Sequence, residues 1–279
     1  MKARAKSALG RVLFATGVGR RLLGRAAVVV TFHRVQNGAD PRGLSVSSEM
    51  FEQCCRFFKD AFHVVPLGEL IARLERGRPV DRCLAITFDD GYADNFDNAR
   101  PVLEALSLPA TFFIVSGWME SGVWPWWDRE QGIRHRWMTW TQVRELHTRG
   151  FEIGAHTRTH VDLGRADEAL AVEEIGGARR DLEERLGARV DLFAYPYGGR
   201  DHLTEANRAV VKAAGFRCCC SCYGGLAAAD VDPFRLQRVA VSGGYDSPAQ
   251  FALDLVREPR PHRTFRRRRC CEMSEAIGY

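Results

Sequence analysis

The sequence predicts an α/β fold in which about eight short, mostly parallel strands close into a barrel, within a single domain. Short apolar runs alternate with longer amphipathic segments, as in strand–helix–strand units joined by right-handed crossovers. The run at 84–88 is continuously apolar, which is typical of a strand covered on both faces. A chain of 279 residues is also long enough for one such barrel with a large core.

The expected elements follow from these periods in chain order. Strands are expected at residues 26–32, 63–65, 84–88, 110–115, 151–153, 192–195, 216–222 and 236–241. Helices are expected at residues 48–62, 67–76, 94–106, 139–150, 166–186, 203–214 and 247–256. The domain organisation is therefore a basic helical segment at 1–25, the barrel at 26–257, and a basic tail at 258–279 that is expected to be disordered.

Capping residues define several of the helix boundaries. Ser48 is a suitable N-cap for a helix whose apolar residues recur every three to four positions as far as Phe62. Asp94 or Asn95 can cap the helix that follows the strand at 84–88. Gly187 is expected to end the long charged helix before it.

Charge and cysteine content narrow the class of protein. The net charge of +5 is modest and lies mostly at the two ends, so we expect no nucleic-acid partner. Nine cysteines occur without the spacing of a disulfide framework, which favours a reducing cytosol. A metal site at 218–222 is disfavoured, because neighbouring residues on a strand point to opposite faces.

The first 25 residues carry seven lysines and arginines around short apolar pieces. The run at 12–15 is too short to span a bilayer, and Gly17 and Gly19 with the arginines after them interrupt a signal-peptide core. The favoured interpretation is an amphipathic helix packed on the domain. The alternative is peripheral contact of the basic termini with the inner face of an anionic membrane. The sequence leaves the oligomeric state open.

Two adjacent carboxylates, Asp89 and Asp90, follow the strand at 84–88 directly. Adjacent side chains on extended backbone point in opposite directions, but where the backbone turns both can reach one pocket with different partners. Gly91 tolerates the positive φ that such a turn requires. From these residues alone, a solvated Asp-Asp-Gly turn is an equal alternative.

Two histidines, His156 and His160, follow the strand at 151–153. Residues four apart face the same way if they form one helical turn. Imidazole suits zinc, cobalt or nickel, and one carboxylate would complete three protein ligands with positions left open. Because an α/β barrel gathers its catalytic groups at the C-terminal ends of its strands, the carboxylates and histidines together predict a metal site.

Three segments, at 87–91, 156–160 and 193–198, resemble in order the first three motifs of the polysaccharide deacetylases, the NodB-homology or carbohydrate esterase family four enzymes. The resemblance extends over residues 26–241. It implies a distorted barrel, often with seven strands. It also implies a hydrolase that removes N-acetyl, or alternatively O-acetyl, groups from a polysaccharide or lipid-linked sugar by attack of metal-bound water.

The resemblance assigns roles to five residues. Asp89 would be the catalytic base, and Asp90, His156 and His160 would hold a divalent metal, zinc first, with cobalt or nickel as alternatives. The backbone N–H of Tyr197 would stabilise the oxyanion.

The general acid is where the sequence departs from the usual pattern. Many family members supply it from a Leu-x-x-His motif near the C-terminus, but Val239 stands at the comparable histidine position. Residues 32–35 instead resemble the Tyr-His-Arg strand of the biofilm-polysaccharide branch, where an N-terminal histidine does this work. We therefore expect His33 to be the general acid.

A second departure is the arginine that usually precedes the proline of the third motif, since Ala194 and Tyr195 stand before Pro196. Arg238 is expected to replace its charge by pairing with Asp89, although it could equally be a surface residue after a strand. Pro196 and Arg238 are both expected to belong to the substrate site.

The irregular segment at 116–137 contains five tryptophans, a density that argues against disorder. Trp126 and Trp127 are expected to form a wall for a saccharide substrate, with Asp128 as its polar contact. The alternative is a loop with a small core of its own. Two other functions stay open: an amidohydrolase on a small nitrogenous compound, and a catalytically inactive sugar-binding protein on the same barrel.

Overall fold

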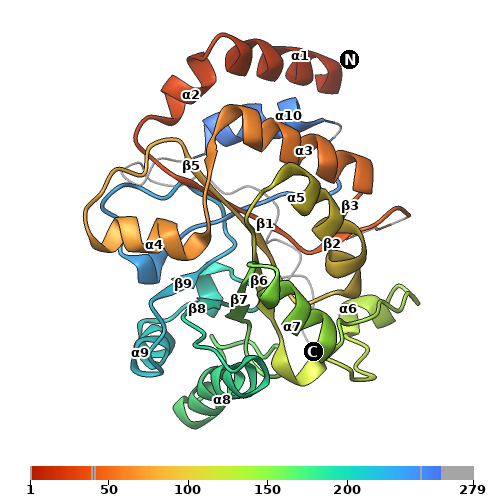
Figure 1. Ribbon diagram of the computed structural model, residues 1–279, viewed down its shortest axis with the longest axis vertical. Coiled ribbons are helices and arrows are strands. Elements are labelled where there is room, and N and C mark those ends of the chain that lie inside the picture. The colour runs from red at the N-terminus through yellow and green to blue at the C-terminus, as the bar shows by residue number, and fades with distance from the viewer. Residues whose placement is uncertain (1, 39, 41, 246, 259–279) are drawn as a thin grey trace.

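The computed structural model describes residues 2–38, 40, 42–245 and 247–258. Its central sheet is parallel throughout and runs along seven strands (Figure 1). Their order is β10 (Val239–Ala240), β1 (Val28–Phe32), β5 (Cys83–Phe88), β6 (Thr111–Ile114), β7 (Glu152–Ala155), β8 (Leu192–Ala194) and β9 (Cys218–Cys220). An eighth strand, β4 (His63–Val64), pairs with the start of β5, while β6 pairs with its end.

The sheet curls until its two edges approach each other. Leu236 forms a parallel bridge with Cys220 of β9, and a few residues later β10 pairs with β1. One short segment therefore contacts both edges. The predicted α/β fold, a distorted barrel of seven to eight mostly parallel strands, is confirmed.

Helices surround the curled sheet (Figure 1). The α-helices after the N-terminal pair are α3 (Ser48–Ala61), α4 (Leu67–Glu75), α5 (Arg100–Leu106), α6 (Trp126–Arg129), α7 (Trp140–Thr148), α8 (Glu168–Leu186), α9 (Glu205–Ala213) and α10 (Pro248–Arg257). Short 3₁₀ or π turns are η1 (Asn95–Ala99), η2 (Ser116–Trp118), η3 (Arg200–His202) and η4 (Pro233–Arg235). Alternate residues of β5 divide between two cores: Leu84, Ile86 and Phe88 pack with the surrounding helices, whereas Cys83 and Ala85 pack with α4.

Three local features differ from the sequence predictions. A small parallel ribbon, β2 (Arg34–Val35) with β3 (Ser45–Val46), was not predicted, because two residues are too few to show a period. The cap of α3 is Ser47, whose hydroxyl accepts from the Met50 N–H, and not Ser48. Asp94 does not cap the next helix; its carboxylate accepts a hydrogen bond from the Val35 N–H at 2.8 Å.

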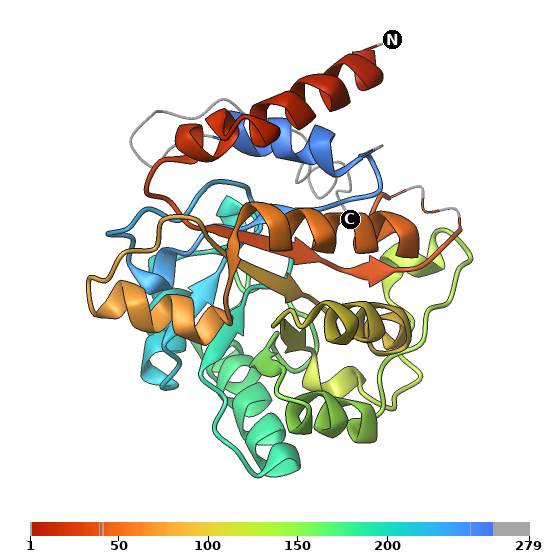
Figure 2. The ribbon, with the colours of Figure 1, turned by 45° about the horizontal axis from the view of Figure 1, so that its top comes forward.

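The N-terminal segment is helical and lies across α10, which in turn contacts α3 (Figure 2). It comprises α1 (Lys2–Ala15) and α2 (Val18–Leu23). Within the described ranges, no helix combines the length and apolar character needed to cross a bilayer. Of the tail at 258–279 that was expected to be disordered, residues 259–279 lie outside the described part. The division into 1–25, 26–257 and 258–279 stays a prediction.

Candidate active site and metal centre

The ends of four parallel strands bring the predicted catalytic residues to one cavity of about 780 Å³. His33 follows β1, Asp89 and Asp90 follow β5, His156 follows β7, and Tyr197 lies in the turn after β8. All five line this cavity, as does His160. Residues that follow β1, β5, β7 and β8 thus meet in one place, because the strands are parallel and their C-terminal ends lie on the same side of the sheet.

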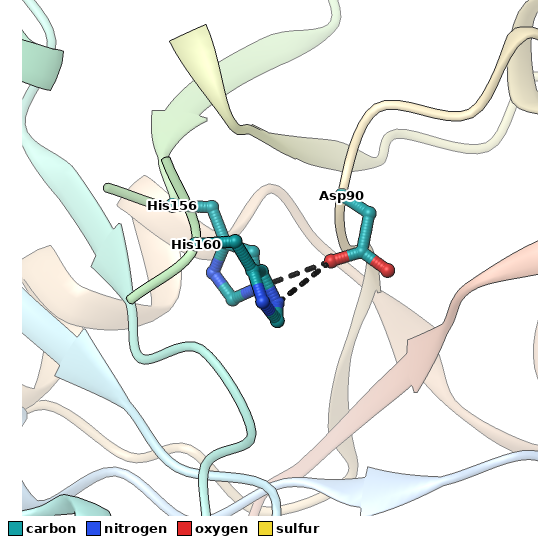
Figure 3. A group of neighbouring side chains, drawn as sticks. All are labelled: Asp90, His156 and His160. Atoms are coloured by element: carbon teal, nitrogen blue, oxygen red, sulfur yellow. Dashed lines mark ion pairs between the residues drawn. The ribbon is translucent and has the colours of Figure 1, made fainter. Parts of the chain in front are cut away.

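Asp90, His156 and His160 converge on one point (Figure 3). Asp90 Oδ1 lies 3.4 Å from His156 Nε2 and 3.3 Å from His160 Nε2. All three side chains are buried. The sequence prediction placed the two histidines on one helical turn, but they lie in a loop. Within this loop the His160 N–H donates to Thr157 Oγ1 at 3.0 Å.

The backbone at this point adopts conformations that side chains other than glycine rarely take. The φ angles of Asp90, His160 and Tyr197 are 74°, 60° and 60°. The left-handed region costs a residue with a Cβ about 1–2 kcal/mol. Strain of this kind persists where the surrounding structure imposes it, and it often accompanies functional sites.

The donor atoms of this cluster fit a divalent metal ion. Ligand atoms of Asp90, His156 and His160 lie within 4.8 Å of one another. The ring Nδ1 of His156 lies 2.8 Å from the carbonyl oxygen of Ala194, which can only accept, so Nδ1 carries a proton and Nε2 is the ring atom that would bind a metal. Asp90 Oδ1 is buried and makes no hydrogen bond among the described residues. Two imidazoles and a carboxylate are the ligand set of many open zinc sites.

The pKa of Asp90 favours its charged form. Burial alone would raise this pKa, but the facing imidazoles of His156 and His160 bring it well below the ordinary value. Burial lowers the pKa of His160, which favours the neutral imidazole. An ionised carboxylate and a neutral imidazole are the protonation states in which these two types of side chain bind a metal.

Asp89 faces the other way and forms a buried ion pair with Arg238. Two hydrogen bonds of 2.7 Å join the guanidinium to the two carboxylate oxygens. Arg238 is fully buried and also donates to the Ser221 carbonyl at 2.8 Å and to the Thr87 hydroxyl at 3.1 Å. Burial would raise the pKa of Asp89, but Arg238 lowers it below the ordinary value. The two adjacent carboxylates therefore have separate partners.

Comparison with known proteins assigns this arrangement to a family. The sequence profile described as polysaccharide deacetylase matches residues 76–219, which is more than half of the chain. The chain belongs to the polysaccharide deacetylase family. Membership makes it a hydrolase of carbon–nitrogen bonds other than peptide bonds.

Individual relatives agree with this assignment. YxkH of Bacillus subtilis (strain 168), a protein named for the same family, is 25% identical over 79% of this chain and 73% of its own length. The poly-β-1,6-N-acetyl-D-glucosamine N-deacetylase of Escherichia coli (strain K12) is 29% identical over 47% of this chain, but the match spans only 20% of that enzyme. The solved structure of Streptococcus pyogenes deacetylase PplD in complex with acetate has the same fold, with a TM-score of 0.70 at 20% identity, over 81% of this chain and 96% of that one.

The tryptophan-rich segment at 116–137 contributes both to the cavity lining and to the main core. Trp126 and Trp127 line the same cavity as the predicted catalytic residues. Trp127 is also buried; its ring lies 5.1 Å from that of His160, and its Nε1–H donates to the Tyr92 hydroxyl at 3.1 Å. Trp118 and Trp137 pack against each other and belong, like Trp127, to the main hydrophobic core. The segment therefore packs into the core of the domain, not into a separate core of its own, and presents two rings to the cavity.

Three predicted substrate contacts do not line the cavity. Asp128 is buried, and its carboxylate accepts a hydrogen bond of 2.9 Å from Arg34. Arg238 lies beneath Asp89 and presents nothing to the cavity. Pro196 is buried in the turn before Tyr197 and is likewise absent from the lining. Their assignment as substrate contacts has no support in their positions.

Other lining residues were missed in the sequence. Arg42, beside the unpredicted ribbon, places its guanidinium 4.9 Å from the centre of the Trp126 ring. His202 lines the cavity, and its Nδ1 lies 2.7 Å from Asp162 Oδ1, while its ring packs 5.2 Å from that of Tyr197. The position of His202, five residues after Tyr197, was the available signal. Nothing in the sequence marked Arg42.

Proposed function

We propose that this deacetylase removes acetyl groups from the amino groups of an N-acetylated hexosamine in a polysaccharide or lipid-linked saccharide, with a divalent metal held by Asp90, His156 and His160. The proposal rests on two adjacent carboxylates that line the same cavity but have different partners. One carboxylate faces two imidazoles, and its neighbour faces a buried guanidinium.

A bound divalent ion, zinc first by its ligand preference and cobalt or nickel as alternatives, would act as a Lewis acid and lower the pKa of a water molecule. Asp90, His156 and His160 are the residues that would hold it. Their burial leaves only the cavity side for the substrate and water.

Asp89 is the proposed general base. Its pKa is lowered, so it is ionised near neutrality, and the Arg238 guanidinium holds its carboxylate in a fixed orientation. The Tyr197 N–H would donate to the oxygen of the tetrahedral intermediate. His33, on the same cavity, would give a proton to the leaving amine.

A saccharide substrate is supported by two features. The relative from Escherichia coli is named for N-acetylglucosamine polymer deacetylation. In this chain, the rings of Trp126, Trp127, Tyr197 and Tyr245 line the cavity, and flat aromatic surfaces suit the apolar faces of sugar rings.

The decisive experiment measures metal content and acetate release together. The purified protein is stripped with a chelator, reloaded with zinc, cobalt or nickel, and tested on N-acetylglucosamine oligomers of increasing length. We expect about one metal ion per chain and acetate release that increases with oligomer length.

Asp90→Asn serves as the control and should lose both metal and activity. Hydrolysis of small cyclic or ureido amides in place of the oligomers would refute the saccharide assignment. Sugar binding without acetate release by the metal-loaded protein would refute catalysis.

A further inference from the structure

The two N-terminal helices carry an apolar surface that is exposed to solvent. Four large aliphatic side chains on α1 and α2 are exposed, Val12 most of all at 58%. They are Leu9, Val12, Val18 and Leu22. They make up half of the eight large apolar side chains that are exposed among the described residues. We call these four residues the N-terminal apolar face.

The opposite side of these helices is firmly packed. Gly10 allows close contact with α10, because a Cβ there would lie 1.8 Å from the Ala249 carbonyl oxygen. Phe14 is buried with its ring 5.1 Å from that of Phe57 on α3. The Ser7 hydroxyl lies 2.7 Å from that of Ser247, the cap of α10. The orientation of the apolar face is therefore fixed by the fold.

The helices that carry the apolar face also carry exposed positive charge. Arg11, Arg21 and Arg25 are exposed on the same two helices and the turn after them. The first acidic residue of the chain is Asp40, so nothing on this segment neutralises them. An apolar strip with basic residues beside it is the pattern of helices that lie in the interface of anionic membranes.

The other exposed aliphatic pair provides a contrast within the same molecule. Leu170 and Val172 on α8 are exposed to a similar degree, Val172 at 49%. The charges beside this pair are mixed: Glu168 is exposed, and Glu173 pairs with Arg158 and Arg180. This pair therefore lacks the excess of positive charge that would attract it to an anionic surface.

We propose that the N-terminal apolar face docks on an anionic lipid surface, with its aliphatic side chains among the headgroups and Arg11, Arg21 and Arg25 against lipid phosphates. A second copy of the chain is a poorer occupant, because a two-fold contact through this face would bring the same arginines together. The proposal concerns docking alone and is independent of the proposed deacetylation. It also does not use the basic residues at 263–269.

The test is co-sedimentation of the full chain with vesicles of phosphatidylcholine alone and of phosphatidylcholine mixed with phosphatidylglycerol. We expect binding to the mixed vesicles only, and release at high salt. Val12→Glu should weaken binding roughly tenfold or more, because it replaces an apolar contact with a negative charge. Val172→Glu, a matched change on α8, should bind like the unchanged protein. Neutralising Arg11 and Arg21 together with glutamine should also weaken binding.

Each variant is first compared with the unchanged protein by circular dichroism and thermal unfolding, since only folded variants are informative. Acetate release from a soluble substrate should be the same in Val12→Glu as in the unchanged protein, which separates docking from catalysis. Equal binding to both kinds of vesicle, or equal loss in Val12→Glu and Val172→Glu, would overturn the proposal. So would a dimer in light scattering that Val12→Glu dissociates without any vesicle binding.

Discussion

The cavity has two walls that are built in different ways. The motif wall consists of Asp89, Asp90, His156, His160 and Tyr197, which stand directly after β5, β7 and β8. The loop wall consists of the lining residues between 36 and 47, Trp126, and those between 240 and 245. The motif wall is fixed by parallel hydrogen-bonded strands of the central sheet, whereas the loop wall combines short backbone pairings with contacts between side chains far apart in the sequence.

One contact illustrates how the loop wall is held. Arg34 of β2 donates to Asp128 of α6 at 2.9 Å, and both side chains are buried. Arg34 also pairs with Asp40 at 3.1 Å, so one guanidinium joins the ribbon, its loop and the tryptophan segment. From this comparison we expect the strand ends to determine the reaction and the loops to determine which substrate is bound. Changes on the motif wall should affect rate, and changes on the loop wall should affect KM.

The largest expected effect is the loss of a metal ligand. His160→Ala should abolish acetate release and strip the metal, because it leaves Asp90 and His156 as the only protein ligands. Metal content is measured by elemental analysis of the purified variant. Retention of a full complement of metal would remove His160 from the proposed ligand set. Thermal unfolding of the variant serves as the check that it is folded.

The next largest effect concerns the other carboxylate of the motif wall. Asp89→Asn should keep the metal but lower kcat by about 10²–10⁴, the usual contribution of a general base. The substitution preserves the shape of the side chain while removing the charge that pairs with Arg238. Loss of metal in this variant would mean that the roles of Asp89 and Asp90 are reversed.

The motif wall was predictable because its signals are local. A continuous apolar run followed by Asp89 and Asp90, and a second strand followed by two histidines, specify their own strand ends. Parallel strands then bring those ends together without further information. The pairing of Asp89 with Arg238, across 149 positions, was reached only through the missing arginine of the third motif.

The loop wall could not be predicted in the same way. Asp128 was assigned to the substrate because it follows two tryptophans, but its partner is Arg34, 94 positions earlier. The ribbon of β2 and β3 has only two residues in each strand, too few for a period. Side-chain pairing between distant loops depends on the whole fold, so a single sequence carries little trace of it.

His33 lies between the motif wall and the loop wall, because it directly follows β1 and directly precedes β2 of the ribbon. His33→Ala should slow hydrolysis of an N-acetylated sugar by about 10²-fold or more, since a sugar amine leaves poorly without a proton. The same variant should keep much of its activity on an aryl acetate, whose leaving group departs unprotonated. Equal losses on both substrates, with metal retained, would show that the proton comes from another group. His202, on the same cavity, would then be the next residue to replace.

The smallest expected effect belongs to the loop wall and uses two tryptophans of one segment. Trp126 lines the cavity, whereas Trp124 is 38% exposed and does not. Trp127 is a poor probe, because its contacts with Tyr92 and His160 would mix binding with stability and metal retention. An aromatic contact contributes roughly 0.5–1.5 kcal/mol, so Trp126→Ala should raise KM about two- to tenfold and leave kcat and metal content unchanged. Trp124→Ala removes the same side chain outside the cavity and should change none of these.

Steady-state kinetics on N-acetylglucosamine oligomers separates the outcomes. A fall in kcat for Trp126→Ala, or the same rise in KM for both variants, would show that the loop wall does not act through contact with the substrate.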